Sequence, residues 1–177
     1  QYISYVTGLV KGDLGTSLRT KRPVLTEVQG RYMNTVQLTL LSLTWSVIAG
    51  VLIGVWSGRN RSKWQDYTGM TVAVSGISMP SFWIGFMLIM VFAVKYRLLP
   101  TTGAGSFKNL ILPSITLGVS IAAIIARFTR SSVIEVLKED YVRTARAKGL
   151  REKTVIWKHV FRNCMICLLY TSDAADD

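Results

Sequence analysis

Two cysteines and one histidine are the residues best suited to metal or redox chemistry, and all three lie near the C-terminal end. Cys164 and Cys167 form a C-x-x-C pair, which is half of a four-thiolate zinc site or the spacing of a redox dithiol. The sequence has no second pair, and His159 lies within a basic stretch. We therefore interpret the cysteines as incidental and expect no metal site and no cofactor.

The sequence also lacks the motifs of common catalytic sites. It has no G-x-x-x-x-G-K-[ST] phosphate loop, so we do not expect this chain to bind ATP itself. No Ser-His-Asp set or pair of carboxylates can be placed inside its apolar stretches. We therefore expect no catalytic residues and a protein that is not an enzyme, with an intramembrane enzyme as a remote alternative.

The apolar residues lie in three long uncharged stretches, at residues 34–57, 67–94 and 110–126, with 24, 28 and 17 residues. Half of the 177 residues are apolar, 18% are charged, and the mean hydropathy is +0.34. This composition excludes a disordered chain, and two cysteines cannot support a disulfide scaffold of this length. Because a helix needs about 20 apolar residues to cross a bilayer, we predict an all-α, polytopic membrane protein with three transmembrane helices.

Small residues and prolines within these stretches predict how the helices pack. Gly50, Gly54 and Gly58 recur every four residues, and so do Ser114, Gly118, Ala122 and Ala126. Such spacing lets helix backbones approach closely in lipid and predicts a packed bundle. Pro80 and Pro113 each predict a kink. No stretch contains an ionisable residue, which argues against a proton pump or an ion-coupled carrier.

The charges between the stretches predict the orientation in the membrane. Three spans place residues 58–66 and 127–163 on one side, and residues 1–33 and 95–109 on the other. The first side carries 13 Lys and Arg residues and the second carries eight. By the positive-inside rule, the segment 127–163 is therefore cytoplasmic and the segment 1–33 is extracytoplasmic.

The segment 127–163 carries the densest pattern in the chain. Ser132 and Glu135 fit a capping box, which predicts that a helix begins there. Its apolar face recurs every three or four residues, at Ile134, Leu137, Tyr141 and Ala145. Gly149 is placed to end that helix. A second amphipathic stretch follows, with Val155, Ile156 and Val160 on one face and Lys158 and Arg162 on another.

A basic unit of helix, glycine turn and helix has three possible partners: anionic lipid, nucleic acid, or a groove on a protein. Four acidic residues interrupt the basic run and argue against nucleic acid, namely Glu135, Glu139, Asp140 and Glu152. The residues alone leave the lipid surface and the protein partner open.

A resemblance to a known family favours the protein partner. The string DYVRTARAKGL, followed by Val155, His159, Arg162 and Asn163, is similar to the cytoplasmic EAA loop of ABC-transporter permeases. The similar branch imports dipeptides and oligopeptides, and some relatives import nickel. Four further strings resemble outer and membrane segments of those permeases, in the same order: KGDLGTSLRTKRPV, ISMPSFWIG, LPSITLG and ARFTRSSVIEVL. The resemblance covers roughly residues 8 to 166.

The resemblance implies the fold and the function of a type I ABC-importer permease, with three of about six transmembrane helices present. Such a subunit forms the transmembrane pathway of an ATP-driven, binding-protein-dependent importer of dipeptides or oligopeptides in the bacterial or archaeal cytoplasmic (inner) membrane. The implied partners are two ABC ATPase subunits, a second permease subunit (similar or identical), an extracytoplasmic solute-binding protein and membrane lipid, and they do not include nucleic acid.

The resemblance also implies that the loop 127–163 couples the permease to the ATPases. The implied coupling residues are Tyr141, Arg143, Thr144, Ala145, Arg146, Ala147, Lys148, Gly149, Leu150, His159, Arg162 and Asn163. Of the general E-A-A-x-x-x-G motif only Ala145 and Gly149 agree, and the peptide branch commonly carries the Arg-Thr-Ala form found here. We expect the small Ala145 and Ala147 to allow close approach to an ATPase groove, and Tyr141 and Leu150 to be anchors buried there.

The two ends of the chain suggest a fragment. Residue 1 is Gln, and the final residues, LLYTSDAADD, are acidic and differ from the family. We therefore expect residues 164–177 to be a truncated and partly non-native tail. The alternative to a transporter is a membrane-anchored scaffold whose basic loop binds lipid or a protein without transport.

Overall fold

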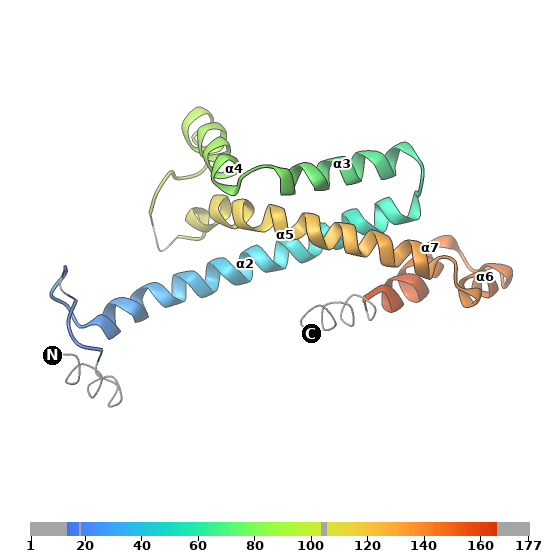
Figure 1. Ribbon diagram of the computed structural model, residues 1–177, viewed down its shortest axis with the longest axis horizontal. Coiled ribbons are helices and arrows are strands. Elements are labelled where there is room, and N and C mark those ends of the chain that lie inside the picture. Colours follow the sequence, from blue (N-terminus) through green and yellow to red (C-terminus); the bar gives the residue numbers. More distant parts are fainter. Residues whose placement is uncertain (1–13, 18, 104–105, 166–177) are drawn as a thin grey trace.

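The computed structural model describes residues 14–17, 19–103 and 106–165, and most of these residues are helical (Figure 1). In chain order the elements are α2 (Val24–Arg59), α3 (Trp64–Ser78), α4 (Ser81–Leu88), the π-helix η1 (Ile89–Lys95), α5 (Phe107–Val136), α6 (Asp140–Ala147), α7 (Glu152–Thr154) and the π-helix η2 (Val155–Val160). The described ranges contain no β-strand, and the predicted all-α class is confirmed. Most of the predicted tail, residues 166–177, lies outside the described residues.

The two longest helices, α2 and α5, lie side by side and run in the same direction, and α3 runs back along them (Figure 1). Each of the two is long and apolar enough to cross a membrane. The predicted first and third spans therefore form helices, but both helices are longer than the apolar stretches. α2 begins at Val24 rather than at residue 34, and α5 continues past residue 126 to Val136.

Glycines bring the backbones of α2 and α5 together. A Cβ added at Gly50 would lie 2.6 Å from the carbonyl oxygen of Ala122, and one at Gly54 would lie 2.7 Å from that of Ala126. Gly58 continues the contact with the side chain of Val133. These distances leave no room for any side chain. They confirm the prediction that the glycine spacing serves close helix packing.

Two polar side chains of α2 reinforce this contact. The indole Nε1 of Trp45 donates a hydrogen bond to the carbonyl oxygen of Ser114 at 2.9 Å. The hydroxyl of Ser46 lies 2.9 Å from the carbonyl oxygen of Gly118. Both bonds join backbone of α5 to side chains of α2, so they favour one register of the two helices.

The second apolar stretch is not the single helix predicted for residues 67–94. It is broken at Met79 and Pro80, and the helices on the two sides of the break are bent by 103°. Both residues have extended backbones, because proline has no N–H to donate and disfavours helical backbone in the residue before it. The two halves make a third span only if the bent pair crosses as one unit. Pro113, in contrast, lies inside α5 without ending it.

The capping box predicted at Ser132 is wrong. Ser132 is buried within α5, which continues to Val136, and the next helix begins only at Asp140. The prediction failed because Val133 and Val136 pack into an apolar core, so the helix is extended by tertiary contacts that local capping signals do not report.

We expect Gly54→Ala to destabilise the protein. The new Cβ would lie 2.5 Å from Cβ of Thr129 as well as against the backbone, so α2 and α5 must move apart. Overpacking of this kind costs about 1–3 kcal/mol, which thermal unfolding of the full-length protein in detergent would detect.

The matched control is Gly30→Ala in the same helix, where an added Cβ meets no atom of the described residues within 4 Å. This change should leave the unfolding midpoint unchanged or raise it, because alanine is the better helix former. Equal effects of the two substitutions would contradict the packing role of Gly54.

Candidate functional site

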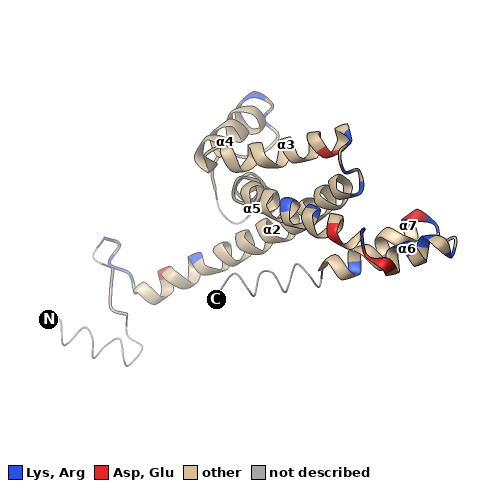
Figure 2. Ribbon diagram, turned by 45° about the vertical axis from the view of Figure 1, so that its right-hand side comes forward, with Lys and Arg blue, Asp and Glu red and all other residues tan. Residues whose placement is uncertain are grey.

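Residues 137–165, here named the basic segment, fold back on the ends of α2 and α5. Figure 2 shows charged residues gathered around α6 and α7, in contrast to the uncharged middle of α2. An apolar core fastens the segment, and its buried members come from α2 (Val51, Val55), α5 (Val133, Val136), α6 (Val142, Ala145) and the last helical stretch (Val155, Ile156, Val160, Cys164). The predicted apolar face of the second amphipathic stretch is confirmed, and Lys158 and Arg162 are exposed as predicted.

Gly149 ends α6 as predicted. Its φ of +75° lies in the left-handed region, which glycine adopts without the steric cost that a Cβ brings. The amide of Gly149 donates to the carbonyl of Arg146 at 2.9 Å, and that of Leu150 donates to the carbonyl of Ala145 at 3.4 Å. This pair of bonds is a Schellman motif, so the turn between the two helices has a defined shape.

Polar side chains also connect the two helices of the basic segment. Arg146 donates two hydrogen bonds to the carboxylate of Glu152, at 2.8 and 3.3 Å. This guanidinium lowers the pKa of Glu152 below the usual value of a glutamate. The amide Nδ2 of Asn163 lies 2.7 Å from the phenol oxygen of Tyr141. The two helices of the basic segment are therefore held together by polar contacts on its outer surface as well as by its apolar core.

Most of the predicted coupling residues lie on the surface of the basic segment. The exposed ones are Tyr141, Arg143, Thr144, Arg146, Ala147, Lys148, Gly149, Leu150, Arg162 and Asn163, and His159 is half-buried. Tyr141 and Leu150, the predicted anchors, are 38% and 40% exposed.

Ala145 is buried within this chain, on the apolar face predicted for it, and therefore presents little surface to a partner. It is 6% exposed and packs into the core of the chain itself. The reason is that it lies one turn after Val142, on the face of α6 that contacts the rest of the chain. Its small size serves packing within this chain, and only Ala147 of the two alanines is exposed.

A buried ion pair next to the basic segment was missed by the sequence analysis. Arg130 of α5 donates from Nε and Nη2 to the two carboxylate oxygens of Asp66, at 2.6 and 2.7 Å. The hydroxyl of Ser57 and the amide of Ser62 also donate to this carboxylate. The Asp66 side chain is 5% exposed, so the cluster joins α2, α3 and α5 at a buried point.

Each partner of this ion pair stands just outside an uncharged stretch, and the two are 64 positions apart. The only signal available was that Asp66 immediately precedes residues 67–94, which places a carboxylate at the end of a membrane helix. Nothing local identifies Arg130 as its partner, because Arg127 is closer still to the third stretch.

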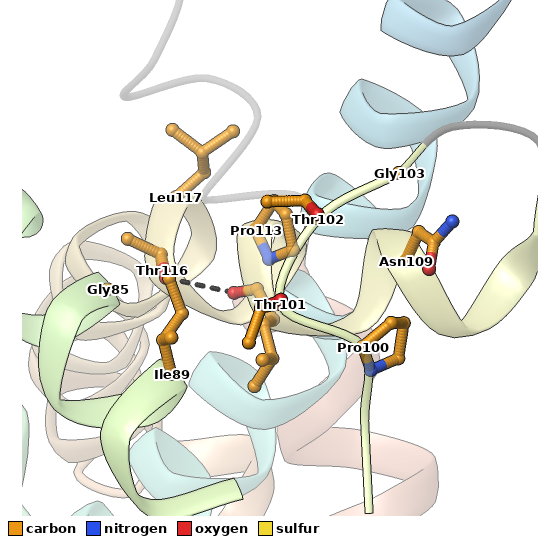
Figure 3. A pocket seen from close by; sticks show the side chains of 11 residues that line it. Gly85, Ile89, Pro100, Thr101, Thr102, Gly103, Asn109, Pro113, Thr116 and Leu117 are labelled. Carbon is orange, nitrogen blue, oxygen red and sulfur yellow. Dashed lines mark hydrogen bonds between the residues drawn. The ribbon is translucent and has the colours of Figure 1, made fainter. Parts of the chain in front are cut away.

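A cavity of about 310 Å³ lies near the start of α5, at the end opposite the basic segment (Figure 3). Gly85 and Ile89 line one wall, and Pro113 and Thr116 of α5 line another. The hydroxyl of Thr116 donates to the carbonyl of Leu112 at 2.8 Å, the bond drawn dashed in Figure 3. The cavity is mostly apolar, and its described lining residues include no titratable side chain.

The cysteine pair has no visible chemistry in the described part of the chain. Cys164 is fully buried, with its sulfur 3.7 Å from the carbonyl oxygen of Thr129. Cys167 lies outside the described residues. Among the residues that the structure describes, no three His, Cys, Asp or Glu side chains gather in a group that could hold a metal ion.

Comparisons with known proteins identify the family. The family model described as "Binding-protein-dependent transport system inner membrane component" matches residues 50–171. The chain is 50% identical over 166 residues to a glutathione transport system permease protein of Pectobacterium atrosepticum, a match that covers 94% of this chain and 54% of the relative. The proteins of that name from Escherichia coli strain K12 and Salmonella typhi are 49% and 48% identical, with the same coverage. The chain thus spans about half the length of the curated relatives it matches.

We expect Asp66→Asn to destabilise the bundle, because it leaves the charge of Arg130 largely buried and without its counter-ion. Breaking a buried pair in this way costs several kcal/mol, and the partial exposure of Arg130 sets the expectation at about 3 kcal/mol. Unfolding of the full-length protein in detergent measures this loss. The double variant Asp66→Asn/Arg130→Gln should recover part of it, and strictly additive losses would contradict the pairing.

The Arg146–Glu152 pair predicts a pH dependence of the basic segment. A carboxyl with a lowered pKa adds stability above its unfolded pKa, and this contribution is lost as the pH falls through the folded value. Because both side chains are more than 40% exposed, the contribution is about 0.2–1 kcal/mol. Hydrogen exchange in residues 140–160, corrected for its intrinsic rate, should therefore accelerate on acidification. Glu152→Gln should remove this acceleration of hydrogen exchange. If the acceleration persists in that variant, it comes from another titratable group.

Proposed function

The chain belongs to the family of binding-protein-dependent transport system inner membrane components, and on that basis we propose that it forms part of the transmembrane pathway of an ATP-driven importer of small peptides. It is a multi-pass protein of the cytoplasmic (inner) membrane. The names of its relatives favour glutathione-type solutes within the broader class of dipeptides and oligopeptides.

The observation that carries the proposal is the exposed surface of the basic segment on a rigid support. Tyr141, Ala147 and Leu150 are exposed, although α6 itself is anchored through Val142 and Ala145. An exposed apolar side chain on a firmly held helix suits docking into a protein groove. We infer that this surface faces the cytoplasm and binds ATPase subunits, which hydrolyse the ATP.

The structure suggests how motion at the basic segment reaches the membrane helices. Val133 and Val136 of α5 belong to the same core as the buried residues of α6. A displacement of α6 therefore acts directly on the end of α5. One turn earlier, Arg130 connects α5 to Asp66 at the start of α3. We propose that the basic segment, the end of α5 and the start of α3 move together during the ATPase cycle. A second permease subunit and an extracytoplasmic solute-binding protein complete the proposed importer.

The direct test is reconstitution of the full-length permease with the ATPase, binding-protein and second permease subunits encoded by its source. Proteoliposomes should accumulate radiolabelled glutathione or a dipeptide when ATP and the binding protein are both present. Accumulation that needs neither would overturn the proposal. A membrane-anchored scaffold predicts lipid binding without any uptake.

We expect Gly149→Leu to uncouple ATP hydrolysis from uptake. Within the described part of the chain nothing lies within 4 Å of an added Cβ, so the effect comes from the left-handed backbone. This conformation costs a residue with a Cβ roughly 1–2 kcal/mol, and relief of the strain shifts the turn that positions α6. The readouts are uptake, ATP hydrolysis and membrane insertion. Uptake should fall while ATP hydrolysis continues, and insertion should be unchanged.

Gly149→Asn is the matched control. Asparagine is similar in size to leucine but tolerates the left-handed region, so it should keep much of the coupling. Full uptake by Gly149→Leu, or equal loss with both variants, would show that the backbone of this turn does not control coupling.

A further inference from the structure

A groove of about 520 Å³ follows α3 from the Asp66–Arg130 ion pair to Ser78. Its apolar lining residues are Met70 and Val74. Along α3, the lining also includes residues that carry hydroxyls, namely Tyr67, Thr71, Ser75 and Ser78. We name it the α3 groove. Its volume falls in the range of about 300–1,000 Å³ that is typical of small-molecule sites.

The hydroxyls lie on the face of α3 that does not contact the bundle. Gly69, Ala73 and Gly76 form the contacting face, where a Cβ at Gly76 would lie 2.8 Å from Cγ1 of Val119. Ser75 and Ser78 donate to carbonyls of their own helix, at 2.8 and 3.0 Å. Their oxygens keep lone pairs that can accept hydrogen bonds from a molecule in the groove.

Arg130 supplies a donor at the end of the groove. Its bonds to Asp66 use Nε and Nη2, and among the described residues Nη1 meets no acceptor. The Arg130 side chain is 29% exposed while that of Asp66 is 5% exposed, so the guanidinium is the more accessible half of the pair. A guanidinium edge recognises carboxylates and carbonyl oxygens.

We propose that the α3 groove lines the solute pathway, and that Nη1 of Arg130 binds the carboxylate of a peptide-like solute at the end of the groove. The inference rests on the proposed function and adds the site where the solute contacts this chain. The hydroxyl protons of Ser75 and Ser78 are satisfied within α3, but the charged guanidinium of Arg130 at the end of the groove favours a water-filled or protein-lined space over lipid tails. A peptide offers the amide donors and the carboxylate that match the hydroxyls and the guanidinium.

Cysteine accessibility tests the proposal on the full-length transporter. In a cysteine-free background, Ser75→Cys and Ser78→Cys are prepared in nanodiscs with the partner subunits. A sulfonate-bearing methanethiosulfonate reagent should label both, because a water-filled pathway admits it. S-methylglutathione, a solute without a reactive thiol, should slow the labelling several-fold when the binding protein and ATP are present.

Val72→Cys is the matched control, because Val72 is 66% exposed, lies on α3 and does not line the groove. It should react slowly, since a thiol that faces lipid is poorly ionised and out of reach of the charged reagent. Labelling of Val72→Cys as fast as that of Ser75→Cys would overturn the proposal. So would unreactive groove cysteines, which would indicate that lipid or a partner helix covers the groove.

The same experiment separates this inference from the proposed function. If the unlabelled transporter accumulates S-methylglutathione but the solute does not protect the groove cysteines, only the inference fails. If no ATP-dependent accumulation occurs, the proposed function fails and the inference with it. For Arg130, the C-terminal amide of the same peptide should protect less well than the free acid, and equal protection would remove Arg130 from solute binding.

Discussion

The contact between α2 and α5 is the constraint on which the rest of the described fold depends. Gly50, Gly54 and Gly58 place the backbone of one helix against the other without intervening side chains. Between helices in lipid there is little hydrophobic driving force, so close packing and hydrogen bonds must hold the pair. Because the two helices are parallel and in contact to their ends, their last turns form one platform, and the basic segment packs on that platform through Val133 and Val136.

The third helix is attached in a different way. α3 contacts the pair through small residues, but its first turn is fixed by the ion pair between Asp66 and Arg130. An ion pair of this burial contributes little net stability compared with an apolar replacement, yet it defines one partner and one geometry. Its position one turn before Val133 places it between the membrane helices and the basic segment. The basic segment and α3 therefore share one point of attachment on α5.

The sequence alone predicted the features that local chemistry controls. Apolar stretches predicted the helices, glycine spacing predicted the close contact, and Gly149 predicted the end of α6. Prediction from the sequence failed where contacts between residues far apart in the chain determine the structure. The helix through Ser132 continues because its next turn is buried, and Asp66 pairs with Arg130 only through the fold. Of the apolar face predicted for this segment, Ala145 is buried but Tyr141 is exposed, because the neighbouring Val142 packs into the core. Pro80 was correctly predicted to disturb its helix, but the 103° bend between the helices on its two sides is larger than the predicted kink.

The break at Met79 and Pro80 also determines whether α3 and α4 can change their orientation relative to each other. On one side, the amide of Met79 donates to the carbonyl of Ser75, and on the other, Trp83 and Ile84 donate to the carbonyl of Pro80. The hydrogen-bond ladders of the two helices thus end at the joint. A change of the angle between α3 and α4 rotates a few backbone torsions and breaks none of these bonds. α3 is held by its ion pair and no residue of α4 is buried, so the angle at the joint is set by what α4 contacts, which includes α5 where Gly85 approaches Thr116.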